Sequence, residues 1–447
     1  MCVAYNGRKL QSVIPMLRTS LCVFLMLAPL ALRADEAKPA PAPAAKTGVS
    51  MSDIRQFTAV FDLVKQAYVD PVDDHKLMQS AIKGLLLDLD PHSAYLEKSD
   101  AQAFDEETNG AYDGIGVEVV TLPDGSVKIV SAIDDTPAAQ AGLRSGDTII
   151  AVDGRELTPA DAVGSGPLRG KPGSSVKLKI VREGAAKPFE VTLKRDTIRV
   201  ASVRSRMLEP GYGYIRISQF QADTAADFEK NLDKLQAQSG GKLRGLVLDL
   251  RSNPGGLLTS AVQIADDLLD SGVIVSTRGR MPGNDATFRA TPGDRMHGAP
   301  VVALVDAGSA SATEVLSGAL RDLHRATIVG SRTFGKGLVQ TLLPLENGDT
   351  VKLTTARYYT PSGKSIQGVG IVPDVVLKPD EATAQKDAED GDVPYTEASL
   401  PGHLHGEDED DAGTNAGDVL PGDTPITAAL QELKKPVAQA ASPVPKG

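Results

Sequence analysis

The chain of 447 residues contains no tryptophan, and its aromatic residues amount to only 4%. Its formal net charge is −11 at pH 7, so it lacks the excess of lysine and arginine that is typical of nucleic-acid-binding domains. Because it has neither a basic stripe nor a set of stacking aromatic rings, we expect no nucleic acid among its partners.

Cysteine is almost absent, since only Cys2 and Cys22 occur and both lie near the N-terminus. Removal of an N-terminal leader would take both of them. The remaining chain would then have no disulfide, no cysteine zinc site and no cysteine nucleophile. Its stability must come from a conventional hydrophobic core, for which its length is ample and suggests about three domains.

Long apolar runs are missing except for LCVFLMLAPLAL at residues 21–32, which follows several basic residues. This run is too short for a comfortable membrane span but suits the core of a signal peptide, so residues 1–34 are interpreted as one. Leu32 departs from the small residue expected ahead of a cleavage site after Ala34, which leaves an uncleaved anchor as the alternative. The segment predicts export, and we expect a periplasmic or cell-envelope location.

The rest of the sequence divides into segments of different pattern. Residues 35–51 form a Pro/Ala linker, and residues 52–111 show helical spacing of apolar residues, which predicts a helical region with those residues in its core. Residues 112–197 contain five or six short strands and two short helical segments, TPAAQAGL and ADAVGSGPL, which fit one compact module.

Residues 198–380 alternate strands with helices, which we expect at 223–237, 257–269 and 311–323. This alternation is typical of a layered α/β domain with a largely parallel sheet. The predicted fold class is therefore mixed α/β, with the small module inserted between the helical region and the larger domain.

Residues 381–447 are polar, acidic and Pro-rich, and we expect them to be largely disordered apart from a short helix in ITAALQELKK. His403 and His405 stand beside the acidic cluster GEDEDDAG. Because the spacing matches no specific ligand pattern, we assign no metal and no cofactor.

The stretch AGSASATEVLSGAL at residues 307–320 follows an apolar strand-like run. Ser311 and Glu314 fit the capping box S-x-x-E, and a helix cap is the commoner explanation for such a pair. A hydroxyl at this turn would also lie beside unpaired N–H groups at the positive end of a helix, where an oxyanion is stabilised. Ser311 is therefore a candidate nucleophile.

The strand-like run LRGLVLDL ends in RSNPGG, which by itself reads as a turn. In a parallel sheet, however, the carboxyl ends of neighbouring strands share one edge, where ligands bind. Gly255 or Gly256 could then present an N–H group near Ser311. Together with the amide of Ala312 it would form an oxyanion hole.

A serine nucleophile needs a base, and the histidines offer none that the sequence supports. His324 lies at the far end of the same predicted helix, roughly 20 Å away. The other candidates ahead of the tail show no local signature of a base: His75, His92 and His297.

Lys336, between two glycines in SRTFGKGLVQ, is the alternative base, although an exposed lysine in a glycine turn is the simpler explanation. Burial would have to lower its pKa from about 10.4 toward about 7 or 8. Gln340 could orient the amine, but in a regular strand the two residues would be about 13 Å apart, so the chain must bend or the side chains must lean together.

These motifs together resemble the carboxyl-terminal processing proteases, also called tail-specific proteases. The resemblance rests on GSASATE, LDLRSNPGG, GKGLVQ and the N-terminal LLLDLDPHSAYL, and it covers about residues 52–380. It implies that Ser311, and not Ser309, is the nucleophile, that Lys336 is the general base and that Gln340 orients the lysine. Thr313 departs from the serine that the family usually has there.

The resemblance further implies an oxyanion hole formed by the amide of Ala312 and a glycine of NPGG, which is Gly255 or Gly256. It implies that the inserted module is a PDZ domain in which Gly114, Ile115, Gly116 and Val117 bind the carboxylate of a peptide that pairs as an added strand. Arg169 would couple this module to the active site, although an ordinary loop arginine is the simpler explanation.

The resulting hypothesis is an exported, ATP-independent serine endopeptidase that recognises the C-terminal tails of protein substrates. An activating adaptor protein and a homodimer are left open as further partners. The first alternative is a non-catalytic PDZ adaptor or chaperone that binds protein C-termini, which the intact serine, lysine and glutamine disfavour. The second is an enzyme of the crotonase-like fold that acts on a thioester, which lacks an evident acyl-carrier site here.

Overall fold

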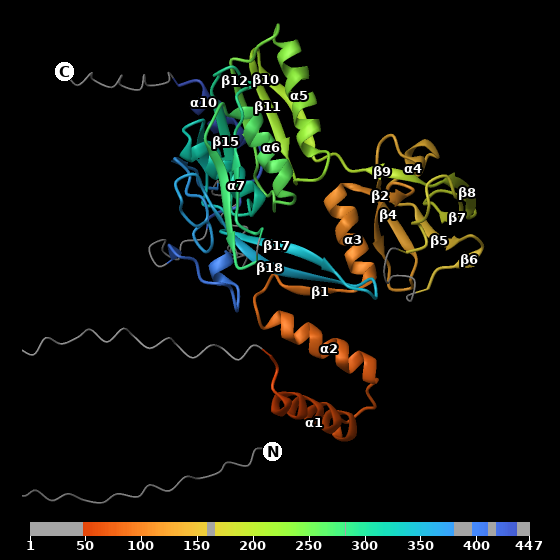
Figure 1. Cartoon of the computed structure of the whole chain (residues 1–447). Coiled ribbons are helices and arrows are strands. Elements are labelled where there is room, and N and C mark those ends of the chain that lie inside the picture. The colour runs from red at the N-terminus through yellow and green to blue at the C-terminus, as the bar shows by residue number, and fades with distance from the viewer. Residues whose placement is uncertain (1–47, 159–165, 282, 380–395, 410–416, 436–447) are drawn as a thin grey trace, which may run out of the picture. The chain divides into compact units, whose positions relative to one another are not determined.

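The computed structural model describes residues 48–158, 166–281, 283–379, 396–409 and 417–435. The predicted signal peptide and most of the Pro/Ala linker lie outside these residues. The chain divides into two compact units, Met1–Pro71, which contains a single described helix, and Val72–Gly447, which contains all other elements (Figure 1). None of the described helices is both long enough and apolar enough to cross a bilayer.

Helix α1 (Met51–Ala67) begins after Ser50, whose side chain accepts a hydrogen bond from Asp53 N. The helix is where its periodicity predicts it, but the expectation that its apolar stripe is core is wrong. No residue of α1 is buried, and Phe57 and Val60 are 48% and 55% exposed. Helix α2 (Asp74–Leu87) buries only Leu86. Periodicity reveals an amphipathic face, but it does not tell what covers that face.

A β module with its own core follows helix α3 (Lys98–Asn109). Its elements are β2 (Ala111–Gly114), β3 (Val117–Thr121), β4 (Val127–Ala132), α4 (Pro137–Gln140), β5 (Thr148–Val152), β6 (Arg155–Glu156), β7 (Ser175–Val181), β8 (Phe189–Lys194) and β9 (Asp196–Arg199). The main sheet has the order β3-β4-β5-β7-β8, with β6 beside β5, and β2 pairs with β9. Helix α4 confirms the first predicted helical segment, whereas most of ADAVGSGPL lies outside the described residues.

The larger domain is built on a six-stranded sheet of order β10-β11-β12-β15-β16-β19, which is parallel from β11 onward. Its strands are β10 (Val203–Glu209), β11 (Tyr212–Ile217), β12 (Gly245–Asp249), β15 (Val301–Val305), β16 (Ala326–Gly330) and β19 (Val375–Val376). This topology confirms the predicted layered α/β domain with a largely parallel sheet.

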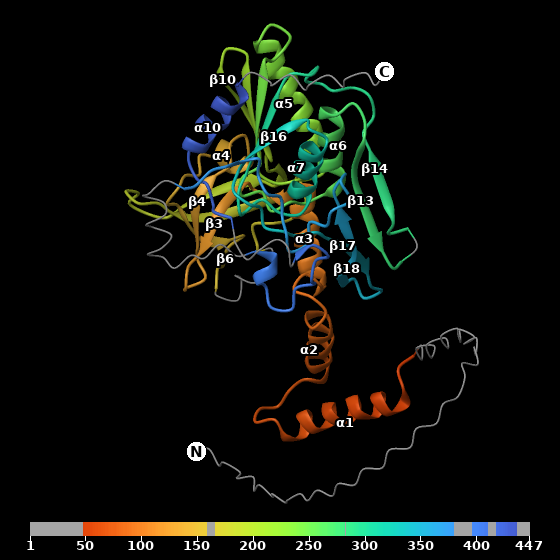
Figure 2. The same ribbon diagram turned by 90° about the vertical axis from the view of Figure 1, so that its left-hand side faces the viewer.

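The three predicted helices are present as α5 (Thr224–Gln238), α6 (Leu258–Leu268) and α7 (Ala312–Asp322). They pack side by side, as Figure 2 shows, and cover one face of the central sheet. Successive residues of β12 point to opposite faces, so Leu246 and Leu248 join the core under these helices while Val247 faces the other way.

The carboxyl ends of β12 and β15 lie next to each other, because Asp249 of β12 pairs with Leu304 of β15. The chain leaves β12 through RSNPGG and leaves β15 through the turn that carries Ser311. The sheet therefore brings the two motifs to one edge, as the sequence predicts.

A second, antiparallel sheet lies beside this edge. Its strands are β1 (Ala94–Leu96), β13 (Val273–Gly279), β14 (Ala286–Arg289), β17 (Leu338–Pro344) and β18 (Thr350–Tyr359), in the order β1-β18-β13-β14 with β17 also paired to β18. Strand β17 follows the GKG segment directly, and its pairing shifts register between Val339 and Gln340. Strand β1 carries the N-terminal motif DPHSAYL to the same sheet.

The short helix expected in ITAALQELKK is present, but the expected disorder of the rest of residues 381–447 is wrong for residues 396–409 and 417–423. Residues 396–409 begin with the short 3-10 helix η2 (Glu397–Ser399), and residues 417–435 end with helix α10 (Thr424–Leu433). Helix α10 lies on the face of the central sheet opposite α5–α7, as Figure 1 shows. Its apolar residues Ile426, Ala429 and Leu433 recur at helical spacing and bury against that face, which compensates for the ordering of an otherwise polar tail.

Candidate active site

The two serines of the SAS motif have different environments. Ser309 is buried, donates to Leu250 O at 2.8 Å and accepts from Asp306 N at 3.0 Å, so it fixes the turn. Ser311 is partly exposed and immediately precedes α7. Its φ of 55° lies in the left-handed region, a conformation that costs roughly 1–3 kcal/mol for a non-glycine residue and concentrates at functional sites.

Asn253 ties the NPGG loop to this serine turn. Its carbonyl accepts hydrogen bonds from Ala310 N and from the Thr313 hydroxyl, each at 3.0 Å. A hydroxyl is what this second bond requires, so threonine can serve where the resembling family usually has serine. Gly255 lies so close to the turn that a Cβ there would be 2.9 Å from the Ser311 Cβ. Only glycine fits at this position.

The backbone around Ser311 offers two unequal glycine donors. The Gly255 N–H already donates to Asn253 Oδ1 at 2.9 Å. Gly256 lies opposite Phe220 in a β-bridge, whose hydrogen bonds are made by the residues on either side of Gly256. The N–H of Gly256 itself donates to no acceptor within the described residues. The N–H of Ala312, the first residue of α7, is likewise without an acceptor in the described part of the chain. Of the sequence candidates, Ala312 and Gly256 are thus the available donors.

Glu314 joins the serine turn to the lysine loop. One carboxylate oxygen, Oε2, accepts from Ser311 N at 2.8 Å and from Lys336 N at 2.9 Å. The other, Oε1, accepts from Gly335 N at 2.7 Å and from the Thr333 hydroxyl at 2.5 Å. The side chain is completely buried, and its burial raises the pKa of Glu314 to about 7 against the effect of these four donors.

The capping box predicted from the sequence is therefore only part of the role of Glu314. Because one oxygen atom accepts from both Ser311 N and Lys336 N, the two segments that carry the candidate nucleophile and base lie side by side. The contact between Glu314 and the GKG segment could not be read from the sequence, since Glu314 lies on α7 and the GKG segment lies in the irregular stretch before β17.

Lys336 lies in the irregular segment before β17 and is largely enclosed. Burial lowers the pKa of Lys336, and repulsion from Lys352 acts in the same direction, whereas the carboxylates of Glu397, Glu314 and Asp90 oppose the change. The ammonium form is thus disfavoured where it sits, as a general base requires.

Gln340 lies on β17, where its side-chain amide donates to the hydroxyl of Thr354 on the neighbouring strand β18 at 3.4 Å. Thr354 in turn donates to Asp90 at 3.0 Å, and Asp90 is buried and also accepts from the Ser93 hydroxyl at 2.7 Å. The pairing of β17 with β18 shifts register between Val339 and Gln340, and among the described residues no hydrogen bond joins the Gln340 side chain to Lys336.

Sequence reasoning missed the contribution of His92 and of the C-terminal segment. His92 Nε2 bonds to the buried carboxylate of Glu397 at 2.8 Å, so its ring ties the N-terminal motif to the C-terminal segment. Glu397 also accepts from Gln367 Nε2 at 2.9 Å, and Gln367 Oε1 accepts from Gly337 N at 3.0 Å. This chain of contacts braces the residue after Lys336. The only signal for it in the sequence is the turn-forming DPHS motif.

A cavity of about 740 Å³ adjoins these residues. Asp90, Leu338 and Thr354 line it together with Arg278 and Leu404. It therefore lies between the second sheet, the N-terminal motif and the C-terminal segment, next to the lysine loop.

The GIGV loop of the β module has the features of a carboxylate-binding loop. Ile115 is buried, and Gly116, at φ 81°, accepts hydrogen bonds through its carbonyl from Ile133 N and the Thr136 hydroxyl. Val117 begins β3, which ends its sheet, so its outer edge is unpaired among the described residues. An extended peptide can add to such an edge while its terminal carboxylate meets the N–H groups of the loop, Gly114 to Val117.

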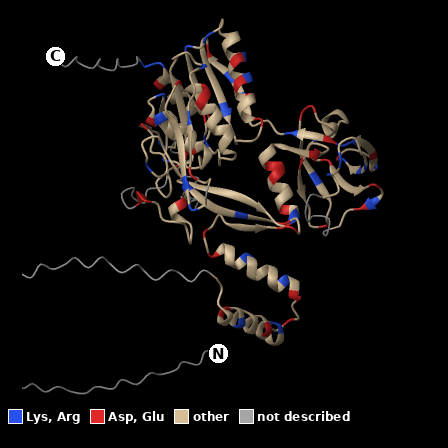
Figure 3. Ribbon diagram, viewed as in Figure 1, with Lys and Arg blue, Asp and Glu red and all other residues tan. Residues whose placement is uncertain are grey.

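Arg169 lies between this loop and α3, whose acidic residues are red in Figure 3. Its guanidinium donates to Glu106 Oε2 at 2.9 Å and stacks on Tyr112 at 3.8 Å from the ring centroid. The end of α3 contacts the larger domain, since Ala222 N donates to Thr108 O at 3.2 Å.

Three segments of the chain match known protein families. Residues 211–377 match peptidase family S41, residues 114–193 match the PDZ domain, and residues 27–100 match the N-terminal domain of the activating protease CtpB. The matched order agrees with the succession of helical region, β module and α/β domain in the structure.

Similar proteins cover most of the chain. A carboxy-terminal-processing protease of Bartonella bacilliformis is 42% identical over 386 residues, which are 86% of this chain and 87% of that protein. The carboxy-terminal processing protease CtpB of Bacillus subtilis is 35% identical over 354 residues, 78% of this chain and 73% of that protein. Among solved structures, a photosystem II D1 C-terminal processing protease aligns with a TM-score of 0.42 and 32% identity over 74% of this chain and 94% of that one.

The raised pKa of Glu314 predicts how stability depends on pH. Because the folded chain keeps a proton on Glu314 that the unfolded chain releases near pH 4.5, its contribution is complete below about pH 4.5 and is lost as the pH rises through about 7. Urea unfolding at pH 5 and pH 8 should show a smaller loss of stability across this interval for Glu314→Gln than for the native chain. An identical loss of stability in both chains would contradict the raised pKa of Glu314.

Proposed function

The chain belongs to the carboxy-terminal processing proteases of peptidase family S41, and we propose that Ser311 is its nucleophile and Lys336 its general base. It is a serine peptidase that carries a PDZ domain and recognises protein C-termini. The observation that carries the proposal is the shared carboxylate of Glu314, which accepts from the backbone N–H of both residues.

In the first half of the reaction, the neutral amine of Lys336 accepts the proton of the Ser311 hydroxyl while Oγ forms a bond to the carbonyl carbon of the scissile peptide. The oxyanion that develops accepts hydrogen bonds from Ala312 N–H and Gly256 N–H. Lys336 then gives the proton to the departing amine nitrogen as the C–N bond breaks. The products of this half are an acyl-enzyme ester and a free amine.

In the second half, Lys336 takes a proton from water as that water attacks the ester, and it returns the proton to Ser311 Oγ as the C–O bond breaks. Gln340 is a positioning residue that orients the amine in this proposal. No step consumes ATP, since the energy of peptide hydrolysis is sufficient, and no step needs a cofactor.

The β module supplies substrate recognition in this scheme. The N–H groups of the GIGV loop bind the terminal carboxylate, and the substrate tail pairs with the open edge of β3, where Val119 and Val120 are exposed beside it.

Arg169 couples the binding of the substrate tail to the larger domain through Glu106 on α3. Arg169→Ala should therefore lower the cleavage rate at saturating tail concentration, and an unchanged rate would remove Arg169 from the scheme.

We also propose that the chain is exported and that it forms a homodimer through its N-terminal helices. The apolar run at residues 21–32 and its basic flank support export to the periplasm or cell envelope. The exposed apolar stripes of α1 and α2 support self-association, since large apolar faces are seldom left in water. An activating adaptor remains a further partner in this proposal.

Removing either proposed catalytic group tests whether the chain is a protease or a non-catalytic binding adaptor. Ser311→Ala and Lys336→Ala should each lower cleavage of a protein with an apolar C-terminus by a factor of roughly 10⁴ or more, while binding of a fluorescent C-terminal peptide is retained. Lys364→Ala is the control, because it removes an exposed side chain, and it should retain full cleavage. Cleavage that persists in either variant would refute the roles, and a native chain that binds tails without cleaving them would favour the adaptor.

The charge of Lys352 should tune the pH profile of cleavage. With its lowered pKa, Lys336 loses its proton as the pH rises, so the rate should rise with pH through that pKa. Lys352→Gln removes a repelling charge, raises the pKa of Lys336 and should shift the profile to higher pH. Lys364→Gln, which changes an exposed lysine that does not perturb Lys336, should leave it in place. A shift to lower pH for Lys352→Gln, or no shift, would contradict the assignment.

The apolar stripe of α1 should determine the oligomeric state. The double variant Phe57→Glu, Val60→Glu places charge on this stripe and should convert dimers to monomers in sedimentation velocity. Gln66→Glu adds charge on the face opposite Phe57 in an ideal helix and should leave dimers intact. Monomeric native chain, or dimers that persist in the double variant, would exclude this interface.

A further inference from the structure

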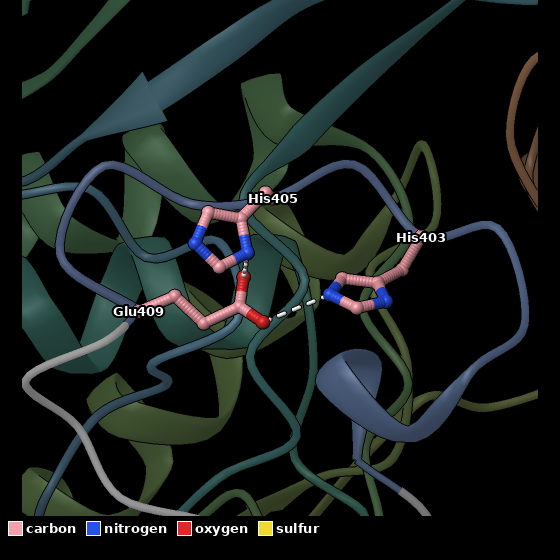
Figure 4. A group of neighbouring side chains, drawn as sticks. All are labelled: His403, His405 and Glu409. Atoms are coloured by element: carbon pink, nitrogen blue, oxygen red, sulfur yellow. Dashed lines mark hydrogen bonds and ion pairs between the residues drawn. The ribbon is translucent and has the colours of Figure 1, made fainter. Parts of the chain in front are cut away.

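Three potential metal ligands converge in the C-terminal segment, as Figure 4 shows. They are His403 Nε2, His405 Nδ1 and the carboxylate of Glu409, and their ligand atoms all lie within 4.8 Å of one another. His403 Nε2 is 2.8 Å from Glu409 Oε1, and His405 Nδ1 is 3.3 Å from Glu409 Oε2. Tetrahedral zinc with bonds of about 2.0 Å places its ligand atoms roughly 3.3 Å apart, so small side-chain movements suffice.

The contacts of His403 orient its ring so that Nε2 faces Glu409. Its Nδ1 lies 3.1 Å from Leu400 O, and a carbonyl can only accept, so Nδ1 carries a hydrogen. Nε2 is then the ring nitrogen that faces the carboxylate oxygen, at 2.8 Å. A metal-binding histidine normally donates its other N–H to such a carbonyl.

The backbone around Glu409 is shaped to hold the carboxylate in this position. Gly368 has a φ of 72°, and a Cβ there would meet Glu409 Oε2 at 2.3 Å. Gly406 donates its N–H to the same oxygen at 2.8 Å, and a Cβ on Gly406 would meet Gln367 O at 1.9 Å. The Glu409 side chain is only 12% exposed. This fit distinguishes the cluster from acidic residues scattered on a surface.

We propose that His403, His405 and Glu409 form a Zn²⁺ site in which water completes the coordination. Two imidazole nitrogens and one carboxylate suit zinc, whereas Mg²⁺ and Ca²⁺ prefer oxygen ligands alone. The expectation of no metal rested on the lack of a specific spacing in the sequence. The folded segment places the three side chains around one point, which the spacing could not reveal.

The zinc site holds residues 396–409 against the lysine loop. Leu404, between the two histidines, accepts through its carbonyl from Gln367 Nε2 at 2.8 Å. Gln367 also contacts Glu397 and Gly337 next to Lys336. Zinc therefore strengthens the attachment of the segment that encloses the proposed base, and the hydrolytic steps are left to Ser311 and Lys336.

The test measures Zn²⁺ binding to the purified full-length chain without an affinity tag. Competition with a chromophoric chelator should give one tight site per chain, and zinc should raise the unfolding midpoint, since binding to the folded state alone stabilises it. His403→Ala and Glu409→Gln should each weaken zinc binding at least tenfold and abolish the rise in midpoint. His297→Ala is the matched control, because it removes a histidine outside the cluster, and it should bind zinc as the native chain does.

His405→Ala decides the case if the other variants fail to fold, because the His405 side chain is 60% exposed and its loss should be tolerated. It too should weaken zinc binding at least tenfold. The proposal is overturned if the native chain takes up no zinc at equimolar concentration, which would leave a protonated His403 paired to Glu409, or if the cluster variants bind zinc as the native chain does. These readouts are independent of proteolysis, so they do not depend on the proposed function.

Discussion

The buried carboxylate of Glu314 is the interaction on which the arrangement of the site depends. It has no counter-ion among its hydrogen-bond partners and is held instead by three backbone N–H groups and the Thr333 hydroxyl. A buried acceptor of this kind is costly to leave unsatisfied, so the serine turn and the lysine loop are pulled to the same point. The strained backbone of Ser311 can persist because the turn is fixed by Glu314, Asn253 and Ser309 together.

The environment of Lys336 is assembled from parts of the chain that are distant in sequence. Asp90 comes from the N-terminal motif, Lys352 from the second sheet and Glu397 from the C-terminal segment. Their charges act in opposite directions, so burial decides the outcome. The C-terminal segment is consequently part of the domain that carries the lysine. The proposed zinc site lies in residues 396–409, which attach that segment to the domain through Gln367.

The sequence predicted the layered α/β domain, its three helices and the β module, because each rests on local periodicity and on turn residues. It also predicted that the NPGG loop and the Ser311 turn meet at one edge, since parallel strands end together. It predicted the helix that is α10 but not its burial, and it wrongly placed the apolar stripe of α1 in a core, for the same reason. Amphipathic helices look alike whether a sheet covers them or not, and only tertiary packing distinguishes α10, which is buried, from α1, which is exposed. Contacts such as Glu314 with Lys336 and His92 with Glu397 depend on chain crossings that local patterns do not encode.

The central claim is that the amine of Lys336 activates the hydroxyl of Ser311, and the most direct measurement is the rate at which a fluorophosphonate phosphonylates that hydroxyl. This reaction needs neither a substrate tail nor the PDZ domain. In the native chain the rate constant should rise with pH through the lowered pKa of the lysine, and in Lys336→Ala it should be far smaller and lack that rise. Equal rates with the same pH profile in both chains would contradict the account.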